Sequence, residues 1–286
     1  MSIRFEKVSH TYSANTPFAY AALKNIDLDI EEGKMTAIIG ATGSGKTTLV
    51  QHLNALLLPT SGKITILDRT IEASVQPKKL KSLRKDVGLV FQFPEYQLFE
   101  ETILKDIIFG PKNFGVSEEE ATQKAIEALR VVDLYDSYLS KSPLDLSGGQ
   151  KRRVAIAGIL AMDPKVLVLD EPTAGLDPQG AKQMMELFKR LNKEFNKTVL
   201  IVTHDMEHVL NYCDEVIVVK DGEIYCKEDV KAFFTRSNLL TELNILPPAV
   251  IQMKNLLSQR GIEIDEDCFS VDELAKAISK RVKSHE

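Results

Sequence analysis

The chain has 286 residues, of which 44% are hydrophobic and 27% charged, and its net charge is −5. This composition is typical of a globular protein with a sizeable core, and the acidic balance argues against nucleic-acid binding. The N-terminus lacks the apolar run of a secretory signal, and no apolar stretch approaches the roughly 20 residues that span a bilayer. Any action on a membrane is therefore expected to need a partner. The three cysteines have no CxxC spacing, which predicts reduced, structural thiols.

The apolar runs predict an α/β fold. Asp27–Ile30 alternates in polarity and Glu32-Gly33 follows as a turn, which predicts an antiparallel strand at the periphery. Four later runs are apolar at consecutive positions, namely Met35–Ile39, Val87–Phe91, Val166–Leu169 and Val199–Val202. Strands that helices cover on both faces show this pattern, and helical patterns separate the runs. We therefore expect a doubly wound, mainly parallel sheet that binds its ligand at the carboxyl ends of its strands.

A phosphate-binding loop follows the first of these runs. It consists of Gly40, Ala41, Thr42, Gly43, Ser44, Gly45, Lys46 and Thr47, and a helix pattern continues from Thr48. Glycines let backbone N–H groups surround phosphates, and a helix N-terminus favours their charge. This loop indicates a bound nucleoside triphosphate: Lys46 is expected to contact its β- and γ-phosphates and Thr47 to ligate Mg²⁺, with Thr48 beside them. Tyr12 is the first candidate to stack on adenine, and Phe18 and Tyr20 compete for that role.

The pattern between Gln92 and Ser147 is helical. Ser117 to Glu120 has the form of a capping box, and an apolar stripe follows at Ala121, Ala125, Ala128, Leu129 and Val132. We predict that about 93–149 is a helical subdomain inserted into the sheet domain. Gln92 stands at the junction, where it can sense Mg²⁺ and water and move the helical part.

A second glycine-rich helix start lies at Ser147, Gly148, Gly149 and Gln150, ahead of the basic run Lys151–Arg153. Such a start is another anion site. One chain does not need two sites for the same phosphate, whereas a dimer with opposed sites uses both. The sequence therefore predicts that this segment contacts a nucleotide held by a partner.

Three polar residues follow the later apolar strands. Asp170 ends one strand and is expected to face the phosphate-binding loop and hold Mg²⁺. Glu171 comes next, as a general base for the attacking water. His204 follows the strand Thr198–Thr203, where it would contact the γ-phosphate and orient water and Glu171.

The C-terminal part has its own signals. Pro247-Pro248 cannot continue a helix and marks a boundary. Ser270 and Glu273 form a second predicted capping box, with Phe269 and Leu274 as its hydrophobic staple. Leu274, Ile278 and Val282 then form an apolar stripe, which favours a small packed or partner-binding unit over a solvated tail.

Together these motifs resemble the nucleotide-binding subunits of ABC transporters. Ser147–Gln150 matches the signature motif, Asp170-Glu171 the Walker B end, and Ala174-Gly175-Leu176-Asp177 the D-loop, whose Asp177 belongs to the nucleotide site by this resemblance. Phe91–Phe99 and Phe109-Gly110-Pro111 resemble the energy-coupling factor branch, and specifically the second of its two paired ATPase types. The resemblance implies an ABC ATPase domain at 3–245 and a C-terminal extension at 246–286 that helps to pair the ATPases.

The resemblance also implies partners and a location. These are a second, similar but distinct ATPase, a transmembrane coupling subunit and membrane-embedded subunits that bind vitamins or other micronutrients, all served from the cytoplasmic face of the cell membrane. Phe93, Glu95, Tyr96, Leu98 and Phe99 are expected near the groove that receives the coupling subunit, or else packed under the helical subdomain. Two alternatives stay open, a homodimeric ATPase of a conventional importer and a soluble ABC protein acting on nucleic acid or ribosomes.

Overall fold

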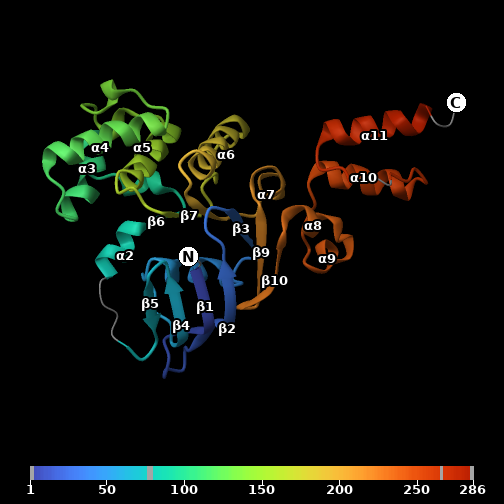
Figure 1. The fold of residues 1–286 in the computed structure, drawn as a ribbon, viewed down its shortest axis with the longest axis horizontal. Coiled ribbons are helices and arrows are strands. Elements are labelled where there is room, and N and C mark those ends of the chain that lie inside the picture. Colours follow the sequence, from blue (N-terminus) through green and yellow to red (C-terminus); the bar gives the residue numbers. More distant parts are fainter. Residues whose placement is uncertain (1–2, 76–79, 265–266, 284–286) are drawn as a thin grey trace.

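The computed structural model describes residues 3–75, 80–264 and 267–283, and it contains two β-sheets (Figure 1). The first is antiparallel, in the order β2 (Tyr20–Ile30), β1 (Ile3–Tyr12), β4 (Ser61–Ile66), β5 (Arg69–Glu72). The second has the order β10 (Glu223–Asp229), β9 (Glu215–Lys220), β3 (Met35–Ile39), β8 (Thr198–Val202), β7 (Val166–Asp170), β6 (Val87–Val90). All neighbours from β9 to β6 are parallel, and β10 is antiparallel to β9. The expected parallel core and antiparallel periphery are both present.

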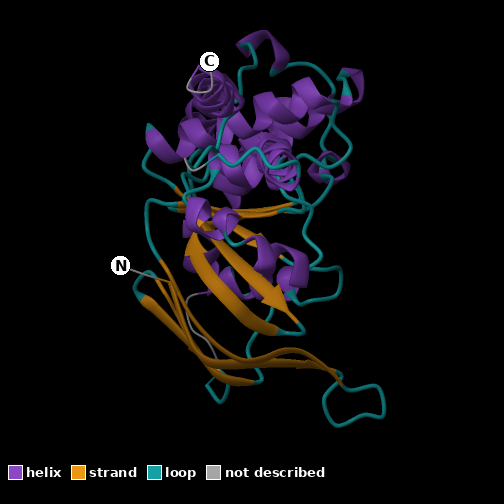
Figure 2. Cartoon of the chain, turned by 90° about the vertical axis from the view of Figure 1, so that its right-hand side faces the viewer, coloured by secondary structure: helices purple, strands orange, loops and turns teal. Residues whose placement is uncertain are grey.

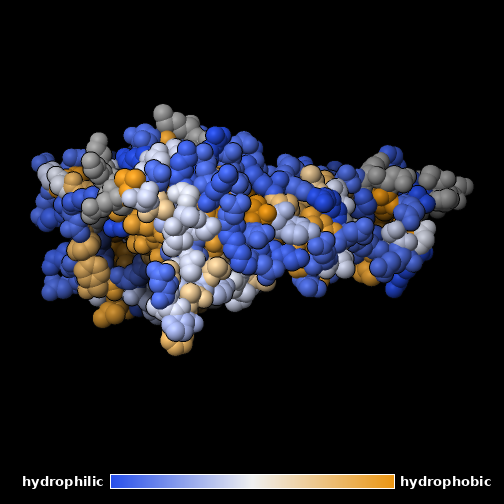
Figure 3. All heavy atoms as spheres, turned by 90° about the horizontal axis from the view of Figure 1, so that it is seen from below, coloured by the Kyte–Doolittle hydropathy of each residue, from blue (hydrophilic) through white to orange (hydrophobic). Residues whose placement is uncertain are grey.

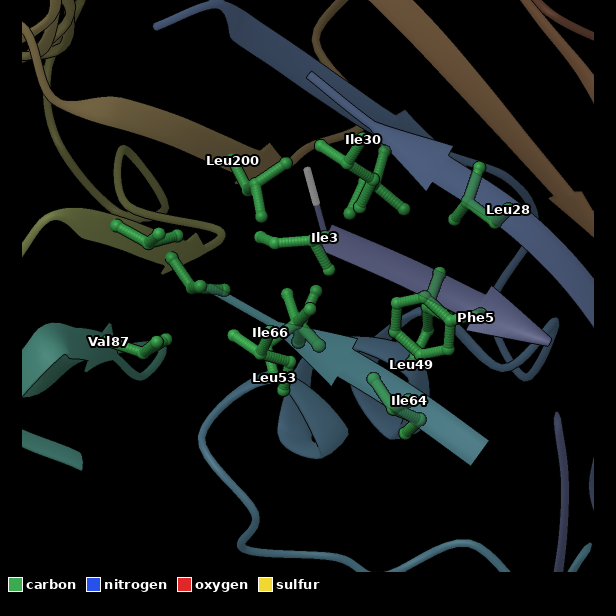
Figure 4. Packing of buried hydrophobic residues seen from close by; sticks show 14 of the residues in the cluster. Ile3, Phe5, Leu28, Ile30, Leu49, Leu53, Ile64, Ile66, Val87 and Leu200 are labelled. Carbon is green, nitrogen blue, oxygen red and sulfur yellow. The ribbon is translucent and has the colours of Figure 1, made fainter. Parts of the chain in front are cut away.

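Alternating side chains of the parallel strands serve two different cores. Val166 and Val168 of β7 join the cluster between the two sheets, whereas Leu167 and Leu169 join the cluster under the helical subdomain. Burial on both faces explains why these strands are mostly apolar at consecutive positions instead of alternating. Helix α1 (Lys46–Leu53) supplies Leu49 and Leu53 to the cluster between the sheets, where Figure 4 shows them beside Phe5 and Ile66. Figure 2 shows helices on both sides of the parallel strands.

The helical subdomain contains α3 (Ile103–Asn113), α4 (Glu118–Val131) and α5 (Gly148–Leu160), with 3₁₀ turns η1 (Pro94–Gln97), η2 (Asp136–Tyr138) and η3 (Pro143–Asp145). The predicted stripe from Ala121 to Val132 is buried. Only the first half of the predicted capping box is present, because Ser117 accepts from the Glu120 N–H while the Glu120 carboxylate lies 3.5 Å from Lys124. The short α2 (Leu80–Asp86) precedes β6, and α6 (Pro178–Lys193) covers β8.

The C-terminal helices are α7 (Met206–Tyr212), α8 (Val230–Thr235), α9 (Ser237–Glu242), α10 (Ala249–Gln259) and α11 (Val271–Lys283). The second predicted capping box is complete, since Ser270 accepts from Glu273 N–H and Glu273 accepts from Ser270 N–H. Leu274 and Ile278 belong to one apolar cluster with Ile39 of β3, so this cluster runs past Pro247-Pro248 without a break. The Val282 side chain lies outside the described residues.

The helical subdomain and the pair α10–α11 lie at opposite ends of the long axis of the molecule (Figure 1). Apolar side chains interrupt the hydrophilic surface at both ends (Figure 3). Among the described helices, none combines the length and the apolar character that crossing a membrane requires.

Candidate functional site

The phosphate-binding loop joins the carboxyl end of β3 to α1, as the sequence predicts. Gly45 caps the helix with φ 107°, and a Cβ there would lie 2.6 Å from the Ala22 carbonyl oxygen, so a side chain does not fit. Lys46 Nζ donates to the carbonyl oxygens of Gly40 (2.8 Å) and Ala41 (2.9 Å). Burial lowers the pKa of Lys46, against the opposing charges of Glu171 and Asp170. The buried Ser44 hydroxyl has no partner among the described protein atoms, so the loop keeps donors for an anion.

Thr47 and Asp170 provide two oxygen atoms at the same edge of the sheet. Thr47 Oγ1 donates to Asp170 Oδ2 over 3.2 Å. Burial raises the pKa of Asp170, while the Thr47 hydrogen bond and Lys46 act in the opposite direction. A hydroxyl and a carboxylate side by side next to the phosphate-binding loop match the oxygen ligands that Mg²⁺ prefers, so the residues fit this ion. Gln92 is exposed just past β6, next to β7 in the sheet, and no hydrogen bond among the described residues joins it to Thr47 or Asp170.

Glu171 and His204 come from neighbouring strands and meet at this edge. His204 Nδ1 lies 3.0 Å from the Glu171 carboxylate. Glu171 has φ 49°, and its N–H donates to the Val202 carbonyl oxygen, which holds the residue in a conformation that non-glycine residues rarely adopt. The His204 side chain is 82% exposed, whereas that of Glu171 is 18% exposed. The His204 imidazole is therefore accessible to a bound molecule, whereas most of the Glu171 side chain is buried.

Two of the three adenine candidates contact the phosphate-binding loop or its helix. The Tyr12 hydroxyl lies 3.2 Å from Thr48 Oγ1, and His10 packs edge-on against the Tyr12 ring. The Tyr20 hydroxyl donates to the Gly43 carbonyl oxygen over 3.3 Å. Phe18 is almost fully exposed in the loop between β1 and β2. Tyr12 is the least exposed of the three and shares a hydrogen bond with a predicted site residue.

The signature segment forms the N-terminus of α5. Ser147 accepts from Gln150 N–H and Gln150 accepts from Ser147 N–H, which is a complete capping box. A Cβ added at Gly148 or at Gly149 would meet no atom within 4 Å. The packing of this chain therefore does not require glycine at either position, and the space above them is free for another molecule. Asp177 caps α6 by accepting from Gly180 N–H over 2.7 Å.

A cavity of about 800 Å³ lies next to the phosphate-binding loop. Its walls include Gly40–Ser44, the His204 loop and the segment from Glu242 to Gln252, but not Ser147–Gln150. Glu207 Oε1 accepts from the Ala249 N–H at the start of α10, and Glu242 accepts from the Tyr225 hydroxyl, both over 2.6 Å. The segment from Glu242 to Gln252 therefore lies against the phosphate-binding loop and the loop that carries His204.

The sequence analysis missed one buried cation, Arg152 of α5, which is 2% exposed. Its guanidinium donates to both carboxylate oxygens of Glu95, over 2.9 and 2.7 Å, and to the carbonyl oxygens of Pro172 (3.1 Å) and Ala174 (2.8 Å). Burial acts to raise the pKa of Glu95, but the Arg152 hydrogen bonds and charge outweigh it and leave this pKa lowered. The Glu95 side chain thus faces inward, whereas Tyr96 and Phe99 are exposed. Helical spacing could have predicted the burial of Arg152, because this residue lies one turn before the buried Ile156 on the same face of α5.

Comparison with known proteins gives one consistent result. The ABC transporter family profile matches residues 23–174. The energy-coupling factor transporter ATP-binding proteins EcfA2 of Enterococcus faecalis and Geobacillus kaustophilus are 52% and 50% identical to the chain. These matches cover 99% and 98% of this chain, and 98% and 97% of the relatives.

Two solved structures are also similar. One is cbiO1 of Clostridium perfringens, part of the ABC transporter complex cbiONQ, with a TM-score of 0.74 and 38% identity over 88% of this chain and 98% of that one. The other is the ATP-binding cassette MJ0796, dimeric in a post-hydrolysis state with ADP and phosphate, with a TM-score of 0.70 and 33% identity over 80% of this chain and 98% of that one.

Proposed function

Since the chain belongs to the ABC transporter family, as an ATP-binding subunit of an energy-coupling factor transporter, we propose that it is one of two unlike ATPases that power micronutrient uptake. The family and fold expected from the motifs are confirmed, and the chain is an ATPase coupled to transport. The observation that carries the residue roles is the Glu171–His204 contact beside the Thr47–Asp170 contact.

The chemistry follows from these positions. When ATP binds, Lys46 exchanges its two carbonyl partners for the β- and γ-phosphates. Thr47 and Asp170, with Gln92 as a further candidate ligand, would hold Mg²⁺, which would neutralise charge on the phosphates. Glu171 accepts a proton from water as the water oxygen bonds to the γ-phosphorus and the bond to ADP breaks. His204 holds the Glu171 carboxylate and contacts the γ-phosphate.

The partner ATPase completes each site. The open surface over Gly148 and Gly149 supports a role for Ser147–Gln150 in capping a nucleotide held by the other subunit. The dimeric state of the similar cassette supports the same arrangement. Exposed Tyr96 and Phe99, just past Gln92, support contact with a transmembrane coupling subunit, which in turn serves membrane-embedded substrate-binding subunits. The chain would then sit on the cytoplasmic face of the membrane as a peripheral subunit.

Glu171→Gln tests the proposed mechanism. In the purified transporter complex, we expect kcat for ATP hydrolysis to fall about 10²–10⁴-fold, because the amide cannot accept the proton. ATP binding stays intact, since the side chain keeps its size, and the ATPase pair stays closed around ATP in size-exclusion chromatography.

Glu186→Gln is the matched control, because it makes the same chemical change on the exposed face of α6, where Glu186 pairs only loosely with Lys182 at 3.9 Å. It should hydrolyse ATP at the wild-type rate. Wild-type turnover in Glu171→Gln would rule out the general-base role. Co-purification of two identical copies of this chain, with no second ATPase, would replace the unlike pair by a homodimer.

A further inference from the structure

The buried Arg152 connects three segments that the sequence keeps far apart. Its side chain starts on α5, behind the signature segment, and reaches Glu95 on η1 at one end of its guanidinium. The other end donates to Pro172 and Ala174, in the turn that directly follows Glu171. An arginine is the only side chain with enough fixed donors to hold a carboxylate and two carbonyl groups at once.

Phe93 also contacts both Arg152 and the turn that follows Glu171. It has φ 54°, a left-handed conformation that costs a non-glycine residue energy and that its surroundings must hold. The Arg152 guanidinium lies 5.8 Å from the centre of the Phe93 ring, within the range of a cation–π contact. On its other side, a Phe93 ring atom comes within 3.3 Å of the position that a Cβ of Gly175 would take. The segment Phe93–Glu95 therefore contacts the turn after Glu171 both directly and through Arg152.

The contacts of Arg152 with Glu95 and with the turn after Glu171 are buried, and this burial restricts their movement. A bidentate arginine–carboxylate pair fixes direction as well as distance, and removing one partner leaves an unpaired buried charge. Tyr96 and Phe99, by contrast, are exposed right next to Glu95. A partner that moves these aromatic residues moves Glu95, and Arg152 passes the displacement to the backbone that carries Glu171.

We propose that Arg152 is a positioning residue. Through Glu95, it transmits a displacement of the exposed surface at Tyr96–Phe99 to Glu171 and thereby sets the hydrolysis rate. This inference rests on the proposed function, since it takes that surface to be the contact with the membrane partner. Transition states tolerate little error in geometry, and a misplacement of about 1 Å can cost about 10²-fold in rate. A small shift of this turn is therefore enough to switch hydrolysis.

The test compares kcat and KM for ATP in two preparations, the complete membrane complex and the ATPase pair released from its membrane proteins. In the wild type, the ratio of the two kcat values measures the influence of the partner. Glu95→Gln keeps the shape of the side chain and leaves the Arg152–carbonyl contacts in place. We expect it to bring this ratio to about one, while kcat of the released pair and both KM values change less than about two-fold.

Arg152→Lys should behave differently, because a lysine keeps the charge but cannot span Glu95 and both carbonyl groups. We expect kcat to fall about 10-fold or more in both preparations with KM little changed. Arg153→Met is the control, since Arg153 is the next residue of α5 but binds Val132, Asp133 and Gln183 instead of Glu95 and the turn after Glu171. It should keep the wild-type ratio.

The double variant Glu95→Met with Arg152→Met separates coupling from folding, because an apolar pair of similar volume often replaces a buried ion pair without loss of stability. We expect normal thermal unfolding with a kcat ratio of about one. If the pair were purely structural, the double variant would change kcat by the same factor in both preparations and so keep the wild-type ratio. The inference is overturned by that result, by a wild-type ratio in Glu95→Gln, or by a wild-type protein whose ratio is already one. Absence of ATP hydrolysis or of membrane partners in the wild type would instead contradict the proposed function.

Discussion

At the scale of single residues, the first question is which aromatic side chain stacks on the adenine base. Tyr12 and Tyr20 reach the phosphate-binding loop through different atoms, Thr48 Oγ1 and the Gly43 carbonyl oxygen respectively. We expect Tyr12→Ala to raise KM for ATP about 10-fold, because stacking a base on an aromatic ring contributes about 1–3 kcal/mol. The value of kcat should stay nearly unchanged, since Tyr12 does not contact the reacting phosphate. Steady-state hydrolysis by the membrane complex measures both quantities.

Three further variants test whether the Tyr12 ring itself stacks on the base. Tyr12→Phe keeps the ring and should keep a low KM, whereas loss of the Thr48 hydrogen bond alone would raise KM in this variant too. Tyr20→Ala and Phe18→Ala should shift KM less than about two-fold if Tyr12 holds the base. A larger shift in Tyr20→Ala than in Tyr12→Ala would transfer the role to Tyr20.

The positions of Thr47, Asp170, Glu171 and His204 could be predicted because each lies at the carboxyl end of a buried strand or in the segment that follows it. Carboxyl ends of parallel strands meet at one edge, so sequence position alone brings these residues together. The inward turn of Glu95 and the burial of Arg152 could not be predicted in the same way. Their pairing joins positions 57 residues apart, and no local pattern states which carboxylate an arginine will meet.

At the scale of elements, the N-terminus of α5 serves two purposes that can be separated. Ser147 and Gln150 cap the helix, so a change at Ser147 disturbs folding as well as function. Gly149 has no such structural role, because an added Cβ meets no atom within 4 Å. We expect Gly149→Ala to keep or raise the melting temperature, since alanine favours a helix over glycine by up to about 1 kcal/mol. The same variant should lower hydrolysis at the site opposite, because the methyl group occupies the space that the partner's nucleotide needs.

Thermal unfolding of the single chain and hydrolysis by the assembled pair check this prediction together. Gly115→Ala is not a suitable control, since Gly115 has φ 86° and alanine would be strained there. Gly158→Ala in the same helix is suitable, because its nearest contacts are ordinary ones at 3.9 Å. Equal hydrolysis in Gly149→Ala and the wild type would show that the open surface of α5 does not face a nucleotide.

The elements that the sequence predicted well are those with local causes. The capping box at Ser270 and Glu273 closes within four residues, and the structure contains it in full. The pairing of β4 with β1 depends instead on contacts between distant segments, as Phe5 with Ile64. The association of the C-terminal helices with Ile39 of the sheet is likewise non-local. Such contacts are decided by which apolar faces remain uncovered, and a single strand or helix pattern does not contain that information.

At the scale of the whole molecule, the two ends of the long axis carry different exposed apolar residues. The helical subdomain presents Tyr96 and Phe99, and the C-terminal extension presents Met253, Leu256 and Val271. The cavity between the phosphate-binding loop and Glu242–Gln252 lies between these ends. This separation favours one end for the membrane partner and the other for the partner ATPase, with the nucleotide site in between.

Two exposed residues of the C-terminal extension test whether this end of the molecule contacts the partner ATPase. Met253 and Leu256 are 49% and 51% exposed and lie one turn apart on α10, so charges there do not disturb the buried Val250 and Ile251. We expect Met253→Asp with Leu256→Asp to raise the dissociation constant of the nucleotide-free ATPase pair at least about 10-fold, since burying two charges offsets the apolar contact. Sedimentation velocity of the co-expressed pair without nucleotide measures this constant.

ATP-driven closure, followed in the Glu171→Gln background, should persist because Ser147–Gln150 is untouched. Tyr135→Asp adds a charge at an exposed aromatic of the helical subdomain and should leave pairing unchanged. Unchanged pairing in the double variant would move the nucleotide-independent contact away from the extension and leave α10 free for a different partner.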